Sequence, residues 1–223
     1  MIPFDMKAPN LHEWENEIGR KLAEAVEAAR LQRVVLLSGI SAHLKSGSAL
    51  GAAMMEERLD GLGIAELVHV RGAFIMENFI KGLPFEAQAQ TGVYSAAFKP
   101  DVATPMIASK DIGEKIADLP LGEPFHQPRV RELLGPRDYT MAEATRILGS
   151  AIGKPDMKYV QCSYGDARKG MIGMGVSPSF ADAVMETARS FNEGDVWAKE
   201  KRSGHNTTPT TLEQFARYAF QGE

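Results

Sequence analysis

The sequence predicts an α/β protein built around a parallel sheet. Two short strand-like runs, 33–37 and 65–70, each follow a segment whose apolar residues recur at helical spacing. A continuous apolar run of this length is typical of a strand that is buried on both faces. Because helix and strand alternate in such short steps, the pattern indicates parallel βαβ connections.

The first half of the chain contains the clearest of these elements. Asn10 and Glu13 stand three residues apart at the start of a helical pattern, as in a capping box. We therefore expect a helix over 11–30. The next elements are expected to be a strand over 33–37, a helix over 50–62 that a glycine closes, and a strand over 65–70.

The second half changes character and is expected to mix helices with short strands. Capping boxes are predicted at Thr140 with Glu143 and at Thr210 with Glu213, and another helix is predicted to have Ser177 as its cap and Pro178 as its first residue. The later strands are expected over 106–108, 129–134 and 158–162, and the helices over 109–118, 140–152, 166–174, 178–191 and 210–220. We expect two regions, a parallel α/β region over 1–80 and a smaller mixed α/β lobe over 81–223, which interleaves with the sheet.

Composition excludes several classes of protein. No apolar stretch approaches the ~18 residues of a membrane-spanning helix. The N-terminus lacks the pattern of a secretory signal, and a lone Cys162 excludes an internal disulfide and a cysteine-based zinc site. A net charge of −4 without a basic stripe argues against nucleic-acid binding. The expectation is a cytoplasmic protein that acts on small molecules.

Local motifs alone do not assemble a complete active site. The sequence contains no HExxH, GxSxG, GxGxxG or GxxxxGK[ST] motif. His43 follows the carboxyl end of a predicted parallel strand, where α/β sheets bind ligands, so we consider it as a ligand contact. His69 is interpreted as a satisfied interior histidine, and Glu56-Glu57-Arg58 as a solvated helix face with local ion pairs.

An ordered set of segments resembles the NmrA-like family of atypical short-chain dehydrogenases/reductases. The strand ending in Ser-Gly, the helix with Glu before Leu, and the later Phe-x-Met-Glu-Asn segment occur in the family's order. Further matches lie near the C-terminal end of the chain. The matching segments are Val34–Gly39, His43–Leu50, Glu57–Leu59, Val70–Asn78, Lys110–Gly113, Glu132–Tyr139 and Gly204–Phe215.

The resemblance implies a Rossmann-like fold, bound NADP or NAD, and an oxidoreductase activity. In that family an NAD(P)H-dependent reductase acts on a small carbonyl or quinone, and the cofactor supplies the hydride. When the family's functional positions are carried over to this sequence, they imply residues that contact the cofactor and residues that line the entrance to the substrate site. The implied cofactor contacts are Pro3, Phe4, Ser38, Gly39, Gly72, Ala73 and Phe74, and the implied substrate contacts, with His43 added, are Met76 and Asn78.

The sequence departs from the family pattern in two ways. The GxxGxxG turn that holds the cofactor pyrophosphate is absent, and Met1 to Phe4 match the end of the family's fourth strand. We therefore expect a partial Rossmann-like sheet that lacks about 70–80 residues, with impaired cofactor binding. Either a misassigned start codon or a natural truncation would account for the missing residues. The Tyr and Lys of short-chain dehydrogenases correspond to Ala49 and Ala53, so no catalytic residue is carried over.

Two expectations follow from these departures. The absent Tyr and Lys leave open an alternative, a regulatory protein that senses a dinucleotide without turnover. The absent strands would also leave one edge of the strand at 34–37 open, with unpaired backbone groups. We expect a homodimer, a swapped element or another cover over this edge.

Overall fold

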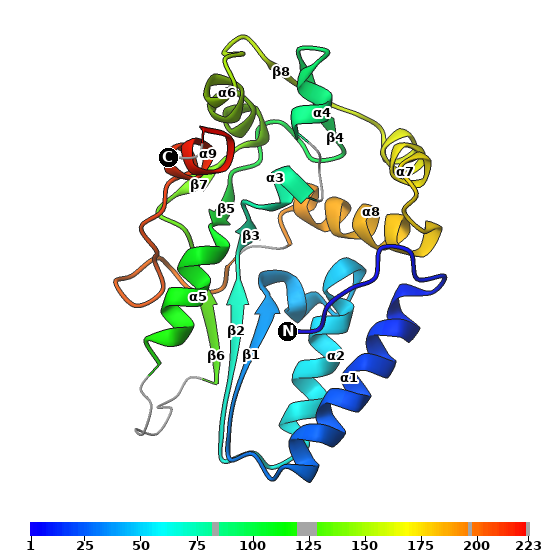
Figure 1. Ribbon diagram of the computed structural model, residues 1–223, viewed down its shortest axis with the longest axis vertical. Coiled ribbons are helices and arrows are strands. Elements are labelled where there is room, and N and C mark those ends of the chain that lie inside the picture. The colour runs from blue at the N-terminus through cyan, green and yellow to red at the C-terminus, as the bar shows by residue number, and fades with distance from the viewer. Residues whose placement is uncertain (82–84, 120–128, 196–197, 222–223) are drawn as a thin grey trace.

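The computed structural model describes residues 1–81, 85–119, 129–195 and 198–221. Helices and strands alternate along the first part of the chain, and shorter strands are interspersed with helices in the rest (Figure 1). In chain order the elements are α1 (Leu11–Ala28), β1 (Arg33–Gly39), 3₁₀ turns at Ile40–Leu44 and Gly47–Ala49, α2 (Leu50–Asp60), β2 (Glu66–Gly72), β3 (Phe74–Ile75), α3 (Asn78–Lys81), α4 (Phe85–Ala89), β4 (Val93–Ala96), β5 (Thr104–Ile107), α5 (Ser109–Ala117), β6 (Val130–Leu133), β7 (Asp138–Tyr139), α6 (Met141–Ala151), β8 (Lys158–Gln161), α7 (Tyr164–Gly173), α8 (Pro178–Glu193) and α9 (Leu212–Gln221).

A parallel sheet in the order β1-β2-β6 confirms the predicted fold class. β1 and β2 pair along their full length, from Arg33 opposite Glu66 to Gly39 opposite Gly72. β6 lies far along the chain, yet it pairs in parallel with the end of β2. All three strands therefore end at the same edge of the sheet, as parallel pairing requires.

The two faces of this sheet are covered by different helices. Leu36 of β1 packs with Met55 and Leu59 of α2 on one face. Val70 of β2 packs with Ile112 of α5 on the other. Successive side chains of a strand point to opposite faces, so each of these strands contributes to both layers, and α1 lies outside α2 (Figure 1).

The rest of the described chain forms a second packed region beyond the ends of β1 and β2 (Figure 1). Short strands pair as β3 with β5, β5 with β7, and β4 with β8, and only the β5–β7 pair is antiparallel. Helices α6, α8 and α9 pack around an aromatic core that includes Phe74, Phe79, Tyr94 and Phe191. This region covers the end of the sheet at which the predicted site residues lie.

Helix caps show which local predictions were correct. The side chains of Asn10, Thr140 and Ser177 each accept a hydrogen bond from the backbone three residues on, as expected of N-caps. The predicted Thr210–Glu213 box is wrong. Thr211 Oγ1 accepts from Gln214 N at 3.2 Å and Gln214 Oε1 accepts from Thr211 N at 2.8 Å, so the box lies one residue later. The hydroxyl of Thr210 instead donates to the buried Asp111.

One edge of β1 has no strand beside it within the described ranges. Glu66 N of β2 donates to Gln32 O, so the backbone groups of Gln32 point toward β2. Since backbone direction alternates along a strand, the N–H and C=O groups of Val35 and Leu37 point to the unpaired edge.

Within the same ranges, no helix combines the length and apolar character that crossing a bilayer requires.

Candidate functional site

The carboxyl ends of β1 and β2 form the candidate site. Gly39 and Gly72 lie opposite each other at the last register position of the pair, and Ser38 lies opposite Arg71 one position earlier. The chain leaves β1 through the 3₁₀ turn Ile40–Leu44 and leaves β2 toward β3. In open α/β sheets ligands bind outside these strand ends, where connecting segments diverge.

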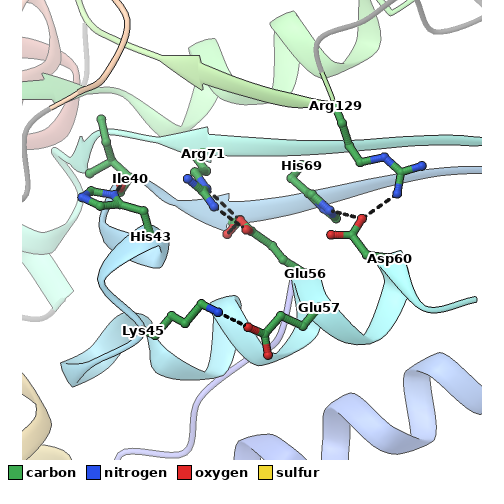
Figure 2. Close-up of polar contacts among 10 residues, drawn as sticks. Ile40, His43, Lys45, Glu56, Glu57, Asp60, His69, Arg71 and Arg129 are labelled. Atoms are coloured by element: carbon green, nitrogen blue, oxygen red, sulfur yellow. Dashed lines mark hydrogen bonds and ion pairs between the residues drawn. The ribbon is translucent and has the colours of Figure 1, made fainter.

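A buried polar network lies under this edge, on the face that α2 covers. The Ser38 hydroxyl and Glu56 Oε1 are 2.5 Å apart. Arg71 donates to the same carboxylate twice, from Nε to Oε1 at 2.9 Å and from Nη2 to Oε2 at 2.5 Å (Figure 2). The hydrogen bonds with Glu56 are the main reason that the pKa of Arg71 is raised, against the opposing effect of burial. The network therefore ties the ends of β1 and β2 to the middle of α2.

Glu132 extends the network onto the third strand. It lies opposite Arg71 in the β2–β6 register and is buried. Its carboxylate accepts from Glu200 N at 2.8 Å and also attracts the Arg71 guanidinium, which contributes to the raised pKa of Arg71. One guanidinium thus faces two buried carboxylates. Removal of this cation would leave both carboxylates buried without a partner charge and would lower the stability of the fold.

A second cluster of polar side chains lies on the same face of the sheet, farther from the strand ends. His69 Nε2 is 3.0 Å from Asp60 Oδ1, and Arg129 Nη1 donates to the same oxygen at 2.6 Å (Figure 2). Burial raises the pKa of Asp60, but the bonds from Arg129 and His69 outweigh it and leave that pKa below its usual value. The predicted interior position of His69 is confirmed, although its buried Nδ1 meets no hydrogen-bond partner among the described residues.

His43 lies in the turn that follows β1, as expected, and bridges two segments. Its Nδ1 is 3.0 Å from Ile40 O and its Nε2 is 3.1 Å from Asp195 O. A neutral imidazole carries one N–H and can donate to only one of these carbonyls at a time. The side chain therefore links the end of β1 to the segment that follows α8.

The residues after β2 lie at different depths. Ala73 is buried, and its N–H donates to Leu133 O at 3.0 Å. Phe74 packs against Phe98 and Phe191 in the aromatic core, and Met76 is fully buried in the same core. Asn78 is exposed at the start of α3.

Pro3 and Phe4 lie apart from this group, on the segment before α1. Pro3 is exposed, and the ring of Phe4 contacts that of Phe180 on α8 at 5.7 Å between centroids. The neighbouring Ile2 packs with Leu36 of β1. The roles assigned to these residues, to Phe74, Met76 and Asn78, and to the strand-end glycines stay predictions.

The structure corrects the interpretation of Glu56-Glu57-Arg58. Glu57 is solvated as expected and pairs with Lys45 on the surface (Figure 2). Glu56 is buried instead, and its partners Arg71 and Ser38 lie 15 and 18 residues away. A polar residue within a helical pattern is no sign of burial, so the available signal was the unusual Arg71 inside an apolar strand.

The end of β1 leaves open space beside its last residue, Gly39. A Cβ added at Gly39 would meet no heavy atom within 4 Å. The backbone there is extended, with φ −113° and ψ 151°. Ala49 and Ala53, which the resemblance aligns with the short-chain dehydrogenase Tyr and Lys, are both buried and carry no proton donor. Among the described residues no group of three or more His, Cys, Asp and Glu side chains is placed to hold a metal ion.

The fold can be compared with those of solved proteins. It is a mixed α/β, Rossmann-like fold, and it matches the folds of solved NAD(P)-binding reductases. A solved NADPH-dependent quinone oxidoreductase, QOR2 from Escherichia coli, superposes with a TM-score of 0.74 at 22% identity, over 92% of this chain and 73% of that one. Triphenylmethane reductase from Citrobacter sp. gives a TM-score of 0.69 at 15% identity, over 92% and 71% of the two chains. These likenesses show the fold.

At the level of sequence, no family model matches this chain. An NAD(P)H azoreductase from Xenophilus azovorans is 27% identical over 167 residues, which are 74% of this chain and 56% of that protein. The chain therefore spans little more than half the length of this curated relative.

Proposed function

We propose that this chain is an NmrA-like, NAD(P)H-dependent reductase that acts on a small carbonyl or quinone acceptor. One observation carries the proposal. Open space lies beside Gly39 at the end of β1, one residue from the buried Ser38–Glu56 contact, within a fold shared with solved reductases. The relatives' names support the chemistry, since they describe reduction of quinones, azo compounds and triphenylmethane dyes.

In the proposal, some residues of the chain contact the cofactor and others contact the acceptor. When bound, NADP or NAD supplies the hydride. Gly39 lets the ligand approach the backbone, because it carries no side chain and its Cβ direction is open, and Gly72 lies opposite it at the end of β2. Ser38, Ala73 and Phe74 complete the nicotinamide side. In the proposal Pro3 and Phe4 lie toward the adenosine side, and His43, Met76 and Asn78 lie toward the acceptor.

A binding and turnover assay tests this function. NADPH and NADH are titrated into the purified chain while tryptophan fluorescence is recorded, and oxidation at 340 nm is then followed with and without menadione as a quinone probe. We expect saturable but weak binding, because the chain lacks the GxxGxxG turn, and oxidation that depends on menadione. No binding at millimolar nucleotide would overturn the proposal.

A second candidate function is a dinucleotide-sensing protein that does not turn over. The observation that favours it is the pair of buried alanines, Ala49 and Ala53, because a site without that Tyr and Lys lacks the usual proton donor for a developing alkoxide. Binding of NADPH without menadione-dependent oxidation would support this alternative, and measurable turnover would exclude it.

We further propose that a second copy of the chain covers the unpaired edge of β1. Val35 and Leu37 are only half-buried, and their outward N–H and C=O groups suit a strand partner. A two-fold axis would bring two β1 strands together, so that the backbone N–H and C=O groups of each strand form hydrogen bonds with those of the other. Light scattering at micromolar concentration is expected to show a dimer that Val35→Lys dissociates. A wild-type monomer at 100 µM, on the order of the concentration that weak association requires, would overturn this proposal.

A further inference from the structure

The oxygen Oε1 of Glu56 is shared by two donors from neighbouring strands. The Ser38 hydroxyl of β1 lies 2.5 Å from it, and Arg71 Nε of β2 lies 2.9 Å from it. Both Ser38 and Glu56 are buried, with exposed fractions of 9% and 7%. The carboxylate is therefore held in one place beneath the ends of two adjacent strands.

The charge on this carboxylate fixes the direction of the Ser38 hydroxyl. The Glu56 carboxylate forms an ion pair with the Arg71 guanidinium, and a carboxylate in an ion pair only accepts hydrogen bonds. The hydroxyl proton of Ser38 must then point to Glu56, which leaves the oxygen lone pairs to accept from another donor. An unconstrained serine hydroxyl would rotate to suit any ligand.

We infer that Glu56 is a positioning residue, which makes Ser38 an oriented hydrogen-bond acceptor at the end of β1. This inference rests on the proposed function. The matching ligand group is an N–H donor, such as the carboxamide of a nicotinamide, and a ligand group that only accepts is disfavoured there. Glu56 itself touches neither cofactor nor acceptor and acts through Ser38 and Arg71.

A purely structural role does not account for the network equally well. Replacement of a buried ion pair by apolar side chains is often neutral or stabilising, so such a pair is weak evidence of a need for stability. Fully satisfied buried networks do impose one geometry on the groups they hold. Here that geometry includes Ser38 and the register position next to the Gly39–Gly72 pair.

A double-mutant cycle between Ser38 and Glu56 separates the two roles. The variants are Ser38→Ala, Glu56→Gln and the double variant, with Glu57→Gln as the matched control on the next residue of the same helix. The readouts are the Kd for NADPH, the kcat and KM with menadione, and the thermal midpoint. The glutamine amide can donate to Ser38, which would turn the serine hydroxyl outward as a donor.

The positioning role predicts effects that do not add. We expect each single variant to weaken NADPH binding about 5- to 10-fold, the scale of one hydrogen bond. The double variant should be no weaker than either single one, because both remove the same interaction. Glu57→Gln should bind like wild type. Full additivity, or a Glu56→Gln variant with wild-type affinity, would overturn the inference.

Two further observations keep the test decisive. If Glu56→Gln fails to fold, Glu56→Met combined with Arg71→Met and Glu132→Gln removes the three buried charges together and is expected to fold but to bind NADPH as weakly as Ser38→Ala. Wild-type affinity in that variant would also overturn the inference. A wild-type chain that binds no NADPH would overturn the proposed function together with the positioning role, whereas normal wild-type binding with unaffected variants overturns the positioning role alone.

Discussion

Arg71 on β2 holds Glu56 on α2 with two hydrogen bonds, of 2.9 and 2.5 Å, and the two side chains are almost completely enclosed. Glu57, the next residue of α2, pairs instead with Lys45, which lies before the helix, and both of these side chains are well exposed to solvent. Each glutamate thus pairs with one cation, and the two pairs differ strongly in burial, so they can be compared.

Arg71→Met is expected to destabilise the fold far more than Lys45→Met. The first variant leaves a buried carboxylate without its cation, which costs about 3–5 kcal/mol in the free energy of unfolding. The second removes an exposed pair, worth about 0–1 kcal/mol. Urea denaturation at pH 7 measures both, and equal losses would contradict the enclosed character of the first pair.

Two glycines inside helices are expected to respond to alanine in opposite directions. A Cβ at Gly149 of α6 would lie 2.6 Å from the backbone oxygen of Lys154, which cannot easily move away. Gly149→Ala should therefore destabilise the protein by about 1–3 kcal/mol. At Gly113 of α5 nothing lies within 4 Å, and Gly113→Ala should stabilise by up to about 1 kcal/mol through helix propensity. Thermal unfolding of the two variants gives the signs, and a stabilising Gly149→Ala would refute the contact.

Glu15 should make the stability of the protein depend on pH. Burial raises the pKa of this carboxyl above its usual 4.5, although His12 acts in the other direction. The folded state therefore holds the proton more tightly than the unfolded chain does. The stabilising contribution is complete below the usual pKa and is lost as pH rises through the folded-state pKa.

Between about pH 4 and pH 8, a range that spans the usual glutamate pKa, the wild-type protein should lose stability as the pH rises. We expect Glu15→Gln to remove this loss of stability. Glu27→Gln, on the exposed side of α1, should keep the wild-type pH dependence. Urea unfolding across the range measures both, and a Glu15→Gln curve parallel to that of wild type would show that Glu15 is not responsible.

Gly39→Leu should block the cofactor without harming the fold. The backbone of Gly39 is extended and its Cβ direction is open, so leucine fits the chain but fills the space proposed for the nicotinamide. We expect NADPH affinity to fall by more than about tenfold, on the order of 1.4 kcal/mol, with an unchanged thermal midpoint. Gly113→Leu, at an exposed position of α5 where the Cβ direction is also open, is a control of equal bulk. Unaltered NADPH binding by Gly39→Leu would place the nicotinamide elsewhere.

Local patterns were sufficient for most of the elements near the site. The capping residues Asn10, Thr140 and Ser177 and the strand at β1 were predictable because each depends on a few neighbouring residues. The cap at Thr211 was missed because two adjacent threonines offer equivalent boxes. The choice between them depends on Asp111, which lies far away in sequence and binds the hydroxyl of Thr210.

The candidate site was predictable only in outline. The position of Ser38, Gly39 and His43 at the end of a parallel strand followed from the order of the elements. The depth of Met76 in the aromatic core, and the link from His43 to Asp195, depend on how the second region packs over the sheet. Both contacts join segments that no local pattern relates.

The sequence by itself therefore determined the α/β class, the parallel strands and the glycines at their ends, since these follow from periodicity and from residues close in the chain. Only the tertiary structure decided that Glu56 is buried against Ser38 and Arg71 while Glu57 faces solvent. Adjacent residues on a helix point about 100° apart. Which of two glutamates meets the sheet is set by the rotation of α2 against β1 and β2, a property of the packed fold.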